Sequence, residues 1–505
     1  MTIKRSVGRL LTHRPRTSEL RLALLFMLLA GIGWRWSLWT RYRFREDEAL
    51  YAHWAWLVYS GIDVMLEQAA VDKPPLFPYT VARLFGLFTP SEAVARLPNL
   101  WASTLALPLL YGWAQALVGR AVAWRAMWLY TVMPLSVLMA PTAYTDALMM
   151  GWLLLSAWAA TRQKPHRIVW AGVSGLALGA SLATKPFAAL WIPVVALSAW
   201  ATQRPRKRWW LTWILGLIYP LWLWWRWEQL RAAPNTLFLA MAHYGGMGWS
   251  SPDQWIDRGR KWLEVARDSW GGWGWLLAGS ITAIIGALNR DQKGRTARCG
   301  LLLWWLLTAG GYVLSTLEPW DRYLLVLAPV GVVLVAAGWA WGQTRWIPRR
   351  GWIFLSIFVI TFGIGWRSSQ AAYPVGGDHG AYDGVDQLSA YIMAELPRGG
   401  VIYHRWLGWH YGFYLFGAPY DYRWWPDIEW LVKDASRPDG IPRVIAFPFW
   451  AEGTRQRVLA RLQAAGVPVC LRYRVYDRDG RLRFYLYRLG PLSSPDAFLS
   501  SSSCR

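Results

Sequence analysis

Cysteine is scarce in this chain, which holds only Cys299, Cys470 and Cys504 among its 505 residues. The three show no CxxC spacing, so a metal or redox site built from paired cysteines is not supported. A disulfide between Cys470 and Cys504 would need both thiols to face an oxidising compartment, and it is the less favoured reading of the pair. No small-residue cleavage site is clear after the first apolar run, so no cleavable signal peptide is expected.

Charged residues are also few. They make up 17% of the chain against 55% hydrophobic residues, and 41 residues are tryptophan. This composition is too apolar for an ordinary soluble protein and indicates a polytopic membrane protein. The formal net charge of +24 comes largely from short basic clusters between apolar runs. Such clusters are typical of cytoplasmic loops, so nucleic-acid binding is not expected.

Apolar runs near the length that crosses a bilayer as a helix, about 20 residues, recur along the chain. If the N-terminus is cytoplasmic, the inside segments hold 22 Lys or Arg and only two acids. This bias predicts a cytoplasmic N-terminus and, with an odd number of spans, an extracytoplasmic C-terminus. We predict eleven spans, at about 20–40, 95–118, 122–141, 146–161, 168–184, 186–203, 209–225, 270–289, 299–317, 323–343 and 351–366.

Two outer segments, 41–94 and 227–269, are too long to be simple connections. The first contains EDEALYAHWAWLVYSG, which is predicted to form a helix along the membrane surface and to stop at Gly61. A second amphipathic stretch follows from Leu76 to Phe88. The first outer segment is therefore expected to carry membrane-surface helices.

The composition changes again near residue 368. Strand-length apolar runs alternate there with helical patterns, and DRDG at 477–480 predicts a hairpin turn. We predict a mainly α-helical transmembrane domain at 1–367 and a small extracytoplasmic α/β domain at 368–505. The glycines of the second domain form no phosphate-binding fingerprint, so no catalytic role is assigned to it.

Charged side chains gather at the outer ends of the apolar runs. Asp47 and Glu48 begin the predicted surface helix, where the helix dipole favours carboxylates even in a purely structural role. Asp146, Lys185 and Arg322 each lie at the outer boundary of a different run. Ordinary interfacial side chains would fit these positions too. Their convergence on one side predicts a single polar cavity, and cations in such a cavity suit a phosphate.

The same stretches carry a family resemblance. Read in order, DEALYA, DKPPL, RLPNLWAS, TAYTDALMM, GLALGASLATKP and DRYLLVLAP resemble the polyprenyl-phosphate-dependent glycosyltransferases of the GT-C superfamily. The nearest branch resembles the protein O-mannosyltransferases and the lipid A aminoarabinose transferase, often grouped as family 39. The resemblance covers roughly residues 20–370. It implies a GT-C fold with about eleven transmembrane helices, surface helices in the first outer loop and a soluble outer C-terminal domain.

The resemblance assigns a role to each of these residues. Asp47 would be the catalytic base that removes a proton from the acceptor hydroxyl or amine, with Glu48 beside it as the weaker candidate. Asp146 would be a second carboxylate that positions the acceptor or the sugar. The donor phosphate would be bound by Lys73, Arg322, Tyr323 and, with a structural role equally open, Lys185.

A divalent metal is a further implication of the resemblance. In the aminoarabinose branch, a histidine of the second long outer loop and an acidic residue before the first-loop lysine can hold one. The matching residues here are His243 and Asp72. Two ligands do not define a metal site, and Asp72 is shorter than the glutamate of that branch. No other cofactor is expected, because the polyprenyl-phosphate sugar is the donor substrate.

Two other functions compete with this interpretation. A transporter or flippase would need an inverted repeat and polar residues near the midplane, and no internal repeat is visible. An O-antigen ligase or polymerase would place its essential residues in a late outer loop rather than in the first. The sequence therefore predicts an inverting glycosyltransferase of the cell membrane that acts on the extracytoplasmic face. The sugar, the acceptor (glycan, lipid or protein) and the oligomeric state stay open.

Overall fold

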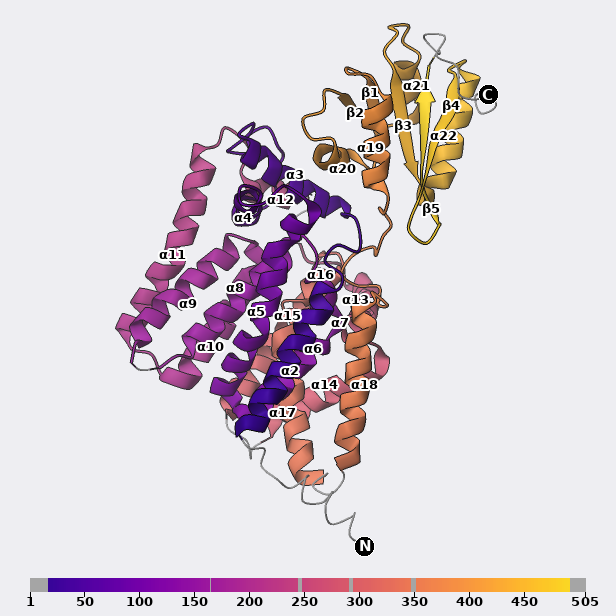
Figure 1. The fold of residues 1–505 in the computed structure, drawn as a ribbon. Helices are drawn as coiled ribbons and strands as arrows, with labels where there is room; N and C mark the ends of the chain where they lie inside the picture. Colours follow the sequence, from indigo (N-terminus) through magenta and orange to yellow (C-terminus); the bar gives the residue numbers. More distant parts are fainter. Residues whose placement is uncertain (1–16, 164, 244–247, 290–293, 347–350, 491–505) are drawn as a thin grey trace. The chain divides into compact units, whose positions relative to one another are not determined.

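The fold was analysed in a computed structural model that describes residues 17–163, 165–243, 248–289, 294–346 and 351–490. The chain divides into two compact units, shown with their helices and strands labelled in Figure 1. The first unit takes in the chain up to Trp39 together with Leu57–Gly377. The second takes in Thr40–Trp56 and the chain from Asp378 onward. Part of the first outer segment thus belongs to the second unit.

The first unit is built from helices. Helix α3 (Glu46–Ser60) begins in the second unit and ends in the first. The other helices of the first unit are α2 (Thr17–Trp36), α4 (Leu76–Phe85), α5 (Glu92–Val118), α6 (Arg120–Val132), α7 (Pro134–Leu138), α8 (Thr145–Ala160), α9 (Arg167–Leu182), η1 (Pro186–Trp191), α10 (Ile192–Gln203), α11 (Lys207–Leu230), α12 (Thr236–His243), η2 (Pro252–Gln254), α13 (Trp255–Trp270), α14 (Trp273–Leu288), α15 (Arg295–Leu314), α16 (Asp321–Leu324), α17 (Ala328–Trp346) and α18 (Gly351–Ser369).

The helices expected in the first outer segment are present. The predicted surface helix is α3, and Gly61 follows it with a φ of +78°, a conformation that glycine adopts without strain. The predicted amphipathic stretch that starts at Leu76 is α4, which ends three residues earlier than expected, at Phe85. Pro75 precedes α4 as its N-cap, a position where its missing N–H costs no intrahelical hydrogen bond.

Glycines let the helices of the first unit approach one another closely. A β-carbon at Gly175 of α9 would lie 2.0 Å from the carbonyl oxygen of Trp213 on α11. A β-carbon at Gly338 of α17 would lie 1.9 Å from the carbonyl oxygen of Thr282 on α14. Small residues at such crossings are typical of helices that pack against one another in membranes.

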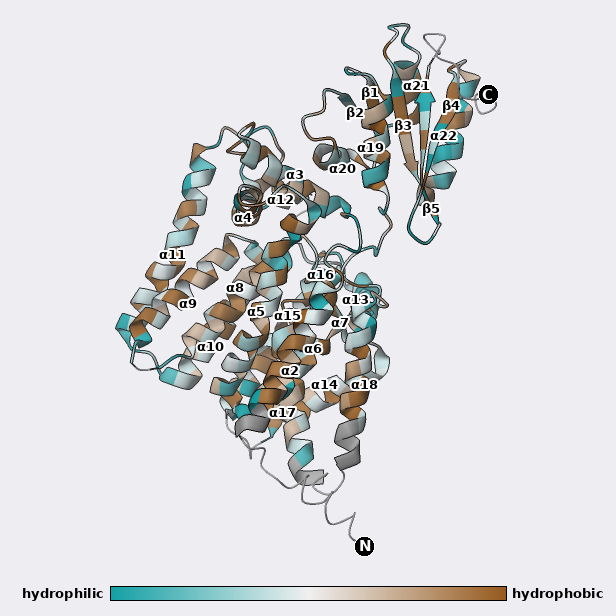
Figure 2. Ribbon diagram, viewed as in Figure 1, coloured by the Kyte–Doolittle hydropathy of each residue, from teal (hydrophilic) through white to brown (hydrophobic). Residues whose placement is uncertain are grey.

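The predicted number of membrane spans is not confirmed. The helices carry many apolar residues (Figure 2), but among the described residues only Pro186–Gln203 and Arg295–Leu314 are long and apolar enough to cross a membrane. A third crossing results if Pro252–Trp270 and Trp273–Leu288, which meet at a bend of 95°, are counted as one span. Several other predicted spans are short helices, such as α8 and α9 with 16 residues each. In α11, charged and tryptophan residues reduce the apolar character.

The second unit is an α/β sandwich; it includes Thr40–Trp56 and resumes at Asp378, whereas we predicted a domain at 368–505. Its sheet has the order β2-β1-β3-β5-β4, in which β1 pairs in parallel with β2 and β3, and β5 pairs antiparallel with β3 and β4. The predicted turn at 477–480 joins β4 to β5, and Gly480 has a φ of +76°. The elements are α19 (Val385–Glu395), β1 (Val401–His404), α20 (Gly408–Tyr414), β2 (Asp421–Trp424), α21 (Ile428–Ala435), β3 (Arg443–Pro448), η3 (Phe449–Ala451), α22 (Glu452–Ala464), β4 (Val469–Tyr476) and β5 (Leu482–Leu489).

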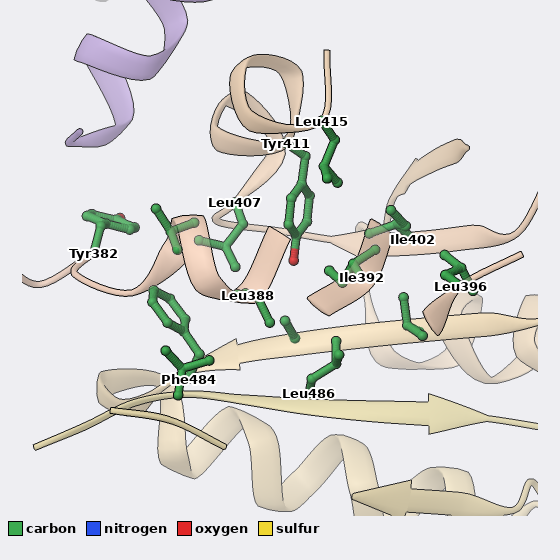
Figure 3. Close-up of a cluster of buried hydrophobic side chains, with 14 residues drawn as sticks. Tyr382, Leu388, Ile392, Leu396, Ile402, Leu407, Tyr411, Leu415, Phe484 and Leu486 are labelled. Atoms are coloured by element: carbon green, nitrogen blue, oxygen red, sulfur yellow. The ribbon is translucent and has the colours of Figure 1, made fainter. Parts of the chain in front are cut away.

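Both faces of this sheet are buried. One face packs on α19 and α20, where Leu388, Ile392 and Tyr411 meet Phe484 and Leu486 of β5 (Figure 3). The other face packs a separate cluster of buried residues against α21 and α22. Strands covered on both sides are expected to be continuously apolar, which explains why RVIAFP in β3 does not alternate.

The cysteines differ in their bonding state. Cys470, in β4, is disulfide-bonded. Cys299 carries a free thiol. Cys504 lies outside the described residues. A disulfide in the second unit is typical of a domain that faces an oxidising compartment.

Candidate active site

The candidate base lies in an acidic turn, Arg45–Glu48, that starts α3. Glu48 is buried, and its Oε2 accepts a hydrogen bond of 3.0 Å from the backbone N–H of Arg45. A glutamate at the third helical position that reaches back to the N-cap in this way is half of a capping box. Glu48 therefore stabilises the helix start, while Asp47 is half-buried in the same turn.

Glu46, the first residue of α3, has a different environment. Its carboxylate accepts a hydrogen bond from the hydroxyl of Tyr382, in the second unit. Burial raises the pKa of Glu46, the hydrogen bond from Tyr382 opposes this shift, and the neighbouring Asp47 adds to it. Glu46 and Glu48, two carboxylates of one helical turn, are thus held in two different ways.

The chain that precedes the turn is bound to the C-terminal part of the second unit. The backbone N–H of Arg43 donates to Asp383 Oδ1 at 2.9 Å, and the Arg43 guanidinium lies 3.2 Å from Asp386 Oδ2. The carbonyl oxygen of Phe44 accepts a hydrogen bond of 2.9 Å from Nε2 of His410. The sequence interpretation missed these partners, since it assigned no role in the site to residues 368–505.

The first unit brings together five of the predicted residues, here called the polar cluster: Lys73, Asp146, Lys185, Arg322 and Tyr323. Lys185 Nζ lies 2.7 Å from Asp146 Oδ1, and only 9% and 2% of the two side chains are exposed. The same ammonium lies 4.8 Å from the centroid of the Tyr323 ring. The guanidinium carbon of Arg322 lies 5.8 Å from that ring. Residues from the outer ends of three different apolar runs therefore lie together around Tyr323.

Long-range charge effects link Lys73 to the same group. Burial lowers the pKa of Lys185 to about 8, Asp146 opposes this shift, and the positive charges of Arg322 and then Lys73 add to it. Lys73 Nζ itself lies 2.5 Å from Asp72 Oδ2. The backbone joins the two segments as well, because the N–H of Leu76 donates to the carbonyl oxygen of Ala183 at 3.1 Å. The cluster thus holds three cations within interaction range of one another.

Asn99 positions the start of α8, which carries Asp146. Its side-chain amide nitrogen donates to the carbonyl oxygens of Thr142 and Tyr144, at 2.6 and 2.5 Å. Its carbonyl oxygen accepts from the N–H of Leu148 at 2.9 Å. Asn99 is fully buried on α5. In the sequence, Asn99 stands out as a polar side chain inside the apolar run RLPNLWAS, but no role was predicted for it.

Asp321 positions the start of α16, which carries Arg322. Its Oδ1 accepts from the backbone N–H of Arg322 at 2.7 Å, and its Oδ2 accepts from the N–H of Gly376 at 2.6 Å. One carboxylate therefore ties the short helix α16 to the chain that follows α18. The guanidinium of Arg322 also lies against Tyr144, 5.5 Å from the ring centroid, beside the start of α8.

The metal site that the resemblance implied falls partly outside the described residues. They contain no group of three or more His, Cys, Asp or Glu side chains that could hold an ion. Asp72 forms an ion pair with Lys73 instead. His243 is the last residue of α12, and its side chain lies outside the described part of the chain. A divalent metal at Asp72 and His243 therefore stays a prediction.

Comparison with known proteins gives a consistent result. The family described as dolichyl-phosphate-mannose-protein mannosyltransferase matches residues 72–225. No curated protein matches the chain. The structure is similar to that of ArnT from Cupriavidus metallidurans in the apo state, with a TM-score of 0.65 and 16% identity over 93% of this chain and 98% of that one. At this identity the likeness shows a shared fold.

Two more solved structures share this fold. ArnT from C. metallidurans bound to undecaprenyl phosphate has a TM-score of 0.60 and 15% identity, over 94% of this chain and 98% of that one. The Archaeoglobus fulgidus oligosaccharyltransferase tethered with an acceptor peptide has a TM-score of 0.55 and 12% identity, over 92% of this chain and 73% of that one. The predicted resemblance to the GT-C superfamily is therefore confirmed.

Proposed function

We propose that this GT-C chain is an integral membrane glycosyltransferase. It takes a sugar from a polyprenyl-phosphate donor and transfers it, with inversion, to an acceptor on the extracytoplasmic face of the cell membrane. The observation that carries the proposal is the polar cluster, in which Lys185, Arg322 and Tyr323 converge on the start of α8. One structure with the same fold is bound to undecaprenyl phosphate, a ligand whose head group is an anion.

Arg322, Tyr323 and Lys73 bind the donor phosphate in this proposal. As the bond between the sugar and the phosphate breaks, negative charge develops on the departing phosphate. Preorganised cations and hydrogen-bond donors stabilise such charge most effectively where water is excluded. Arg322 can engage two phosphate oxygens at once because its guanidinium is planar and delocalised.

The Asp146–Lys185 pair has a more structural role in the proposal. Each of the two charges is already matched by the other at 2.7 Å in a buried setting. The pair joins the start of α8 to the residue before η1, and so fixes two of the segments that surround Tyr323. We propose that Asp146 also positions the sugar or the acceptor, because its Oδ2 has no hydrogen-bond partner among the described residues.

Asp47 is the proposed base. It removes the proton of the acceptor hydroxyl or amine as that atom attacks the anomeric carbon from the face opposite the departing phosphate. Glu48 is less suited to this task, because its carboxylate already caps α3. The proposal includes the eleven spans, the cytoplasmic N-terminus and the extracytoplasmic second unit that the distribution of basic residues predicts.

Reconstitution tests the proposal. The full chain in liposomes would be supplied with labelled polyprenyl-phosphate hexoses and pentoses and with a membrane extract as acceptor, and mass analysis would identify the product. We expect Arg322→Ala to lower transfer by about 10²-fold. Arg267 offers a matched control, since it also lies over an aromatic ring, Trp273, but outside the polar cluster. Arg267→Ala should leave transfer nearly unchanged.

Two results would contradict the proposal. Equal transfer by Arg322→Ala and the wild-type chain would remove Arg322 from the donor site. Labelled sugar that crosses the vesicle membrane without forming any covalent product would favour a transporter instead. An intermediate rate for Arg322→Lys would show that both the charge and its planar geometry contribute.

A further inference from the structure

The segment Thr40–Trp56, here called the first-loop segment, forms one compact unit with the C-terminal part of the chain. It contains the acidic turn and most of α3. The sequence places more than 320 residues between this segment and Asp378, where the rest of the unit begins. The candidate base is therefore carried by the α/β unit, for which no catalytic role was predicted.

Two histidines tie the first-loop segment to α20 in a reciprocal way. His410 of α20 donates from Nε2 to the carbonyl oxygen of Phe44 at 2.9 Å. His53 of α3 donates from Nδ1 to the carbonyl oxygen of Gly412 at 2.8 Å. The ring of Phe413 in α20 also contacts that of Phe44, with the two centroids 5.0 Å apart. Each partner thus fixes the main chain of the other.

Tyr382 extends this contact to the acidic turn itself. Its hydroxyl donates to the carboxylate of Glu46, the residue before Asp47. Its ring stacks on the imidazole of His410, with centroids 4.4 Å apart and planes 23° apart. Both Tyr382 and His410 are buried. The two side chains form one rigid support, because each restricts the movement of the other.

The residues just before Asp47 are fixed one after another. Asp383 accepts a hydrogen bond from the N–H of Arg43. His410 donates to the carbonyl oxygen of Phe44, and Tyr382 donates to the carboxylate of Glu46. The N–H of Arg45 is bound within the turn by Glu48. A base must lie within hydrogen-bond reach of the proton it removes, and a displacement of about 1 Å can cost about 10²-fold in rate.

We propose that the C-terminal α/β unit is part of the catalytic apparatus, because it positions Asp47 through the positioning residues Tyr382 and His410. This inference rests on the proposed function of Asp47 as the base. It assigns the unit the task of orienting the acidic turn, and it predicts that loss of one supporting hydrogen bond lowers the rate of transfer without weakening donor binding.

Tyr382→Phe in the full, reconstituted chain is the first test. It removes only the hydroxyl, so we expect kcat to fall about ten-fold, the effect of one hydrogen bond to a charged group, with the donor KM unchanged. Hydrogen exchange at the amides of residues 43–49 should rise by about the same factor. Tyr391→Phe is the matched control, because Tyr391 of α19 stacks on Tyr473 at 4.3 Å and donates to Arg472 within the same unit. It should change neither quantity.

His410 gives a second test by conservative rescue. The amide of Gln can still donate to the Phe44 carbonyl, whereas Ala cannot, so His410→Gln should retain several-fold more activity than His410→Ala. Unchanged kcat and exchange in Tyr382→Phe would overturn the inference. An equal rise of hydrogen exchange in β1 and β3 of Tyr382→Phe would also overturn it, because that pattern means a general loss of stability. If the wild-type chain transfers no sugar, the proposed function fails, but the exchange data still decide whether Tyr382 holds the turn.

Discussion

The acidic turn and the polar cluster hold their charged groups in different ways. In the polar cluster, Lys185 and Asp146 neutralise each other directly at 2.7 Å. In the acidic turn, three carboxylates follow one another, and the partners observed for Glu46 and Glu48 are a hydroxyl and a backbone N–H. Neutral partners fix a carboxylate without cancelling its charge, whereas a buried ion pair cancels both charges. The Lys185–Asp146 pair therefore suits a structural role.

The largest expected effect is a difference in transfer rate between variants of two carboxylates in the acidic turn, Asp47 and Glu48. Asp47→Asn should lower transfer by about 10²-fold or more while the chain still folds, because general-base assistance is lost. Glu48→Gln should lower it only slightly, since the amide oxygen of Gln can still accept the N–H of Arg45. Initial rates of labelled product formation would measure both variants. Full activity in Asp47→Asn, or an equal loss in both variants, would remove Asp47 as the base.

The next effect concerns the buried pair in the polar cluster. Lys185→Met leaves the Asp146 carboxylate buried without its cation and should lower the free energy of unfolding by about 3–5 kcal/mol. The double variant Lys185→Met/Asp146→Leu should recover much of that loss, because it removes both charges. Thermal unfolding in detergent would provide the values for a double-mutant cycle.

Lys261 and Asp257 on α13 provide the control for this cycle. They are also 2.7 Å apart, but both side chains are more than half exposed. Lys261→Met should therefore cause no measurable loss, since solvent screens an exposed pair. Equal effects at Lys185 and Lys261 would show that burial does not distinguish the polar cluster from an ordinary surface.

Acid pH should act on the acidic turn through His410. Burial lowers the pKa of His410 to about 4, and its bond to the Phe44 carbonyl opposes this shift. An unfolded histidine has a pKa of about 6.5, so between these values the unfolded state binds the extra proton. Stability of the second unit should therefore fall as the pH drops from about 6.5 to 4, by up to about 3 kcal/mol from this residue.

His410→Gln isolates this contribution from that of Glu46, whose pKa burial raises. The variant should be less stable than wild type at neutral pH, and the gap should close toward pH 4 because Gln does not titrate. Hydrogen exchange at residues 43–49 and in β3, measured across this range, would give both quantities. A gap that stays constant with pH would mean that His410 is not held neutral by burial.

The two regions also differ in how much of them the sequence could predict. Asp146, Lys185 and Arg322 interrupt apolar runs, and the cost of placing charge there made their convergence predictable. The partnership of Phe44 with His410 joins residues 366 positions apart. Hydrophobic periodicity reports which face of an element is buried, but not which distant element covers it. The role of the α/β unit at the acidic turn therefore required the structure.

The same reasoning explains the smaller differences. Glu48 could have been recognised as a cap, because it lies three residues after the N-cap, but Arg45 at that N-cap is not the usual Ser or Thr. Near the start of the run predicted at 270–289, Gly271 and Gly272 have φ values of +93° and +125°, and the chain bends there. Positive φ at consecutive glycines is a property of the folded chain that composition alone does not specify.

The smallest effect compares the N-caps of one helix in each unit. Ser91 caps α5 by accepting from the N–H of Val94 at 3.3 Å, and Asp427 caps α21 by accepting from the N–H of Trp430 at 2.8 Å. Ser91→Ala and Asp427→Ala should each cost about 1 kcal/mol. The cost should be larger for Asp427, because its carboxylate also interacts favourably with the helix dipole.

These two variants test whether the units unfold independently. If they do, Ser91→Ala should lower hydrogen-exchange protection in α5 and leave β3 unchanged, and Asp427→Ala should do the reverse. Loss of protection in both units from either variant would show that the chain unfolds as one cooperative body. In that case the acidic turn would respond to changes anywhere in the chain, and Tyr382 and His410 would lose their special place as its local support.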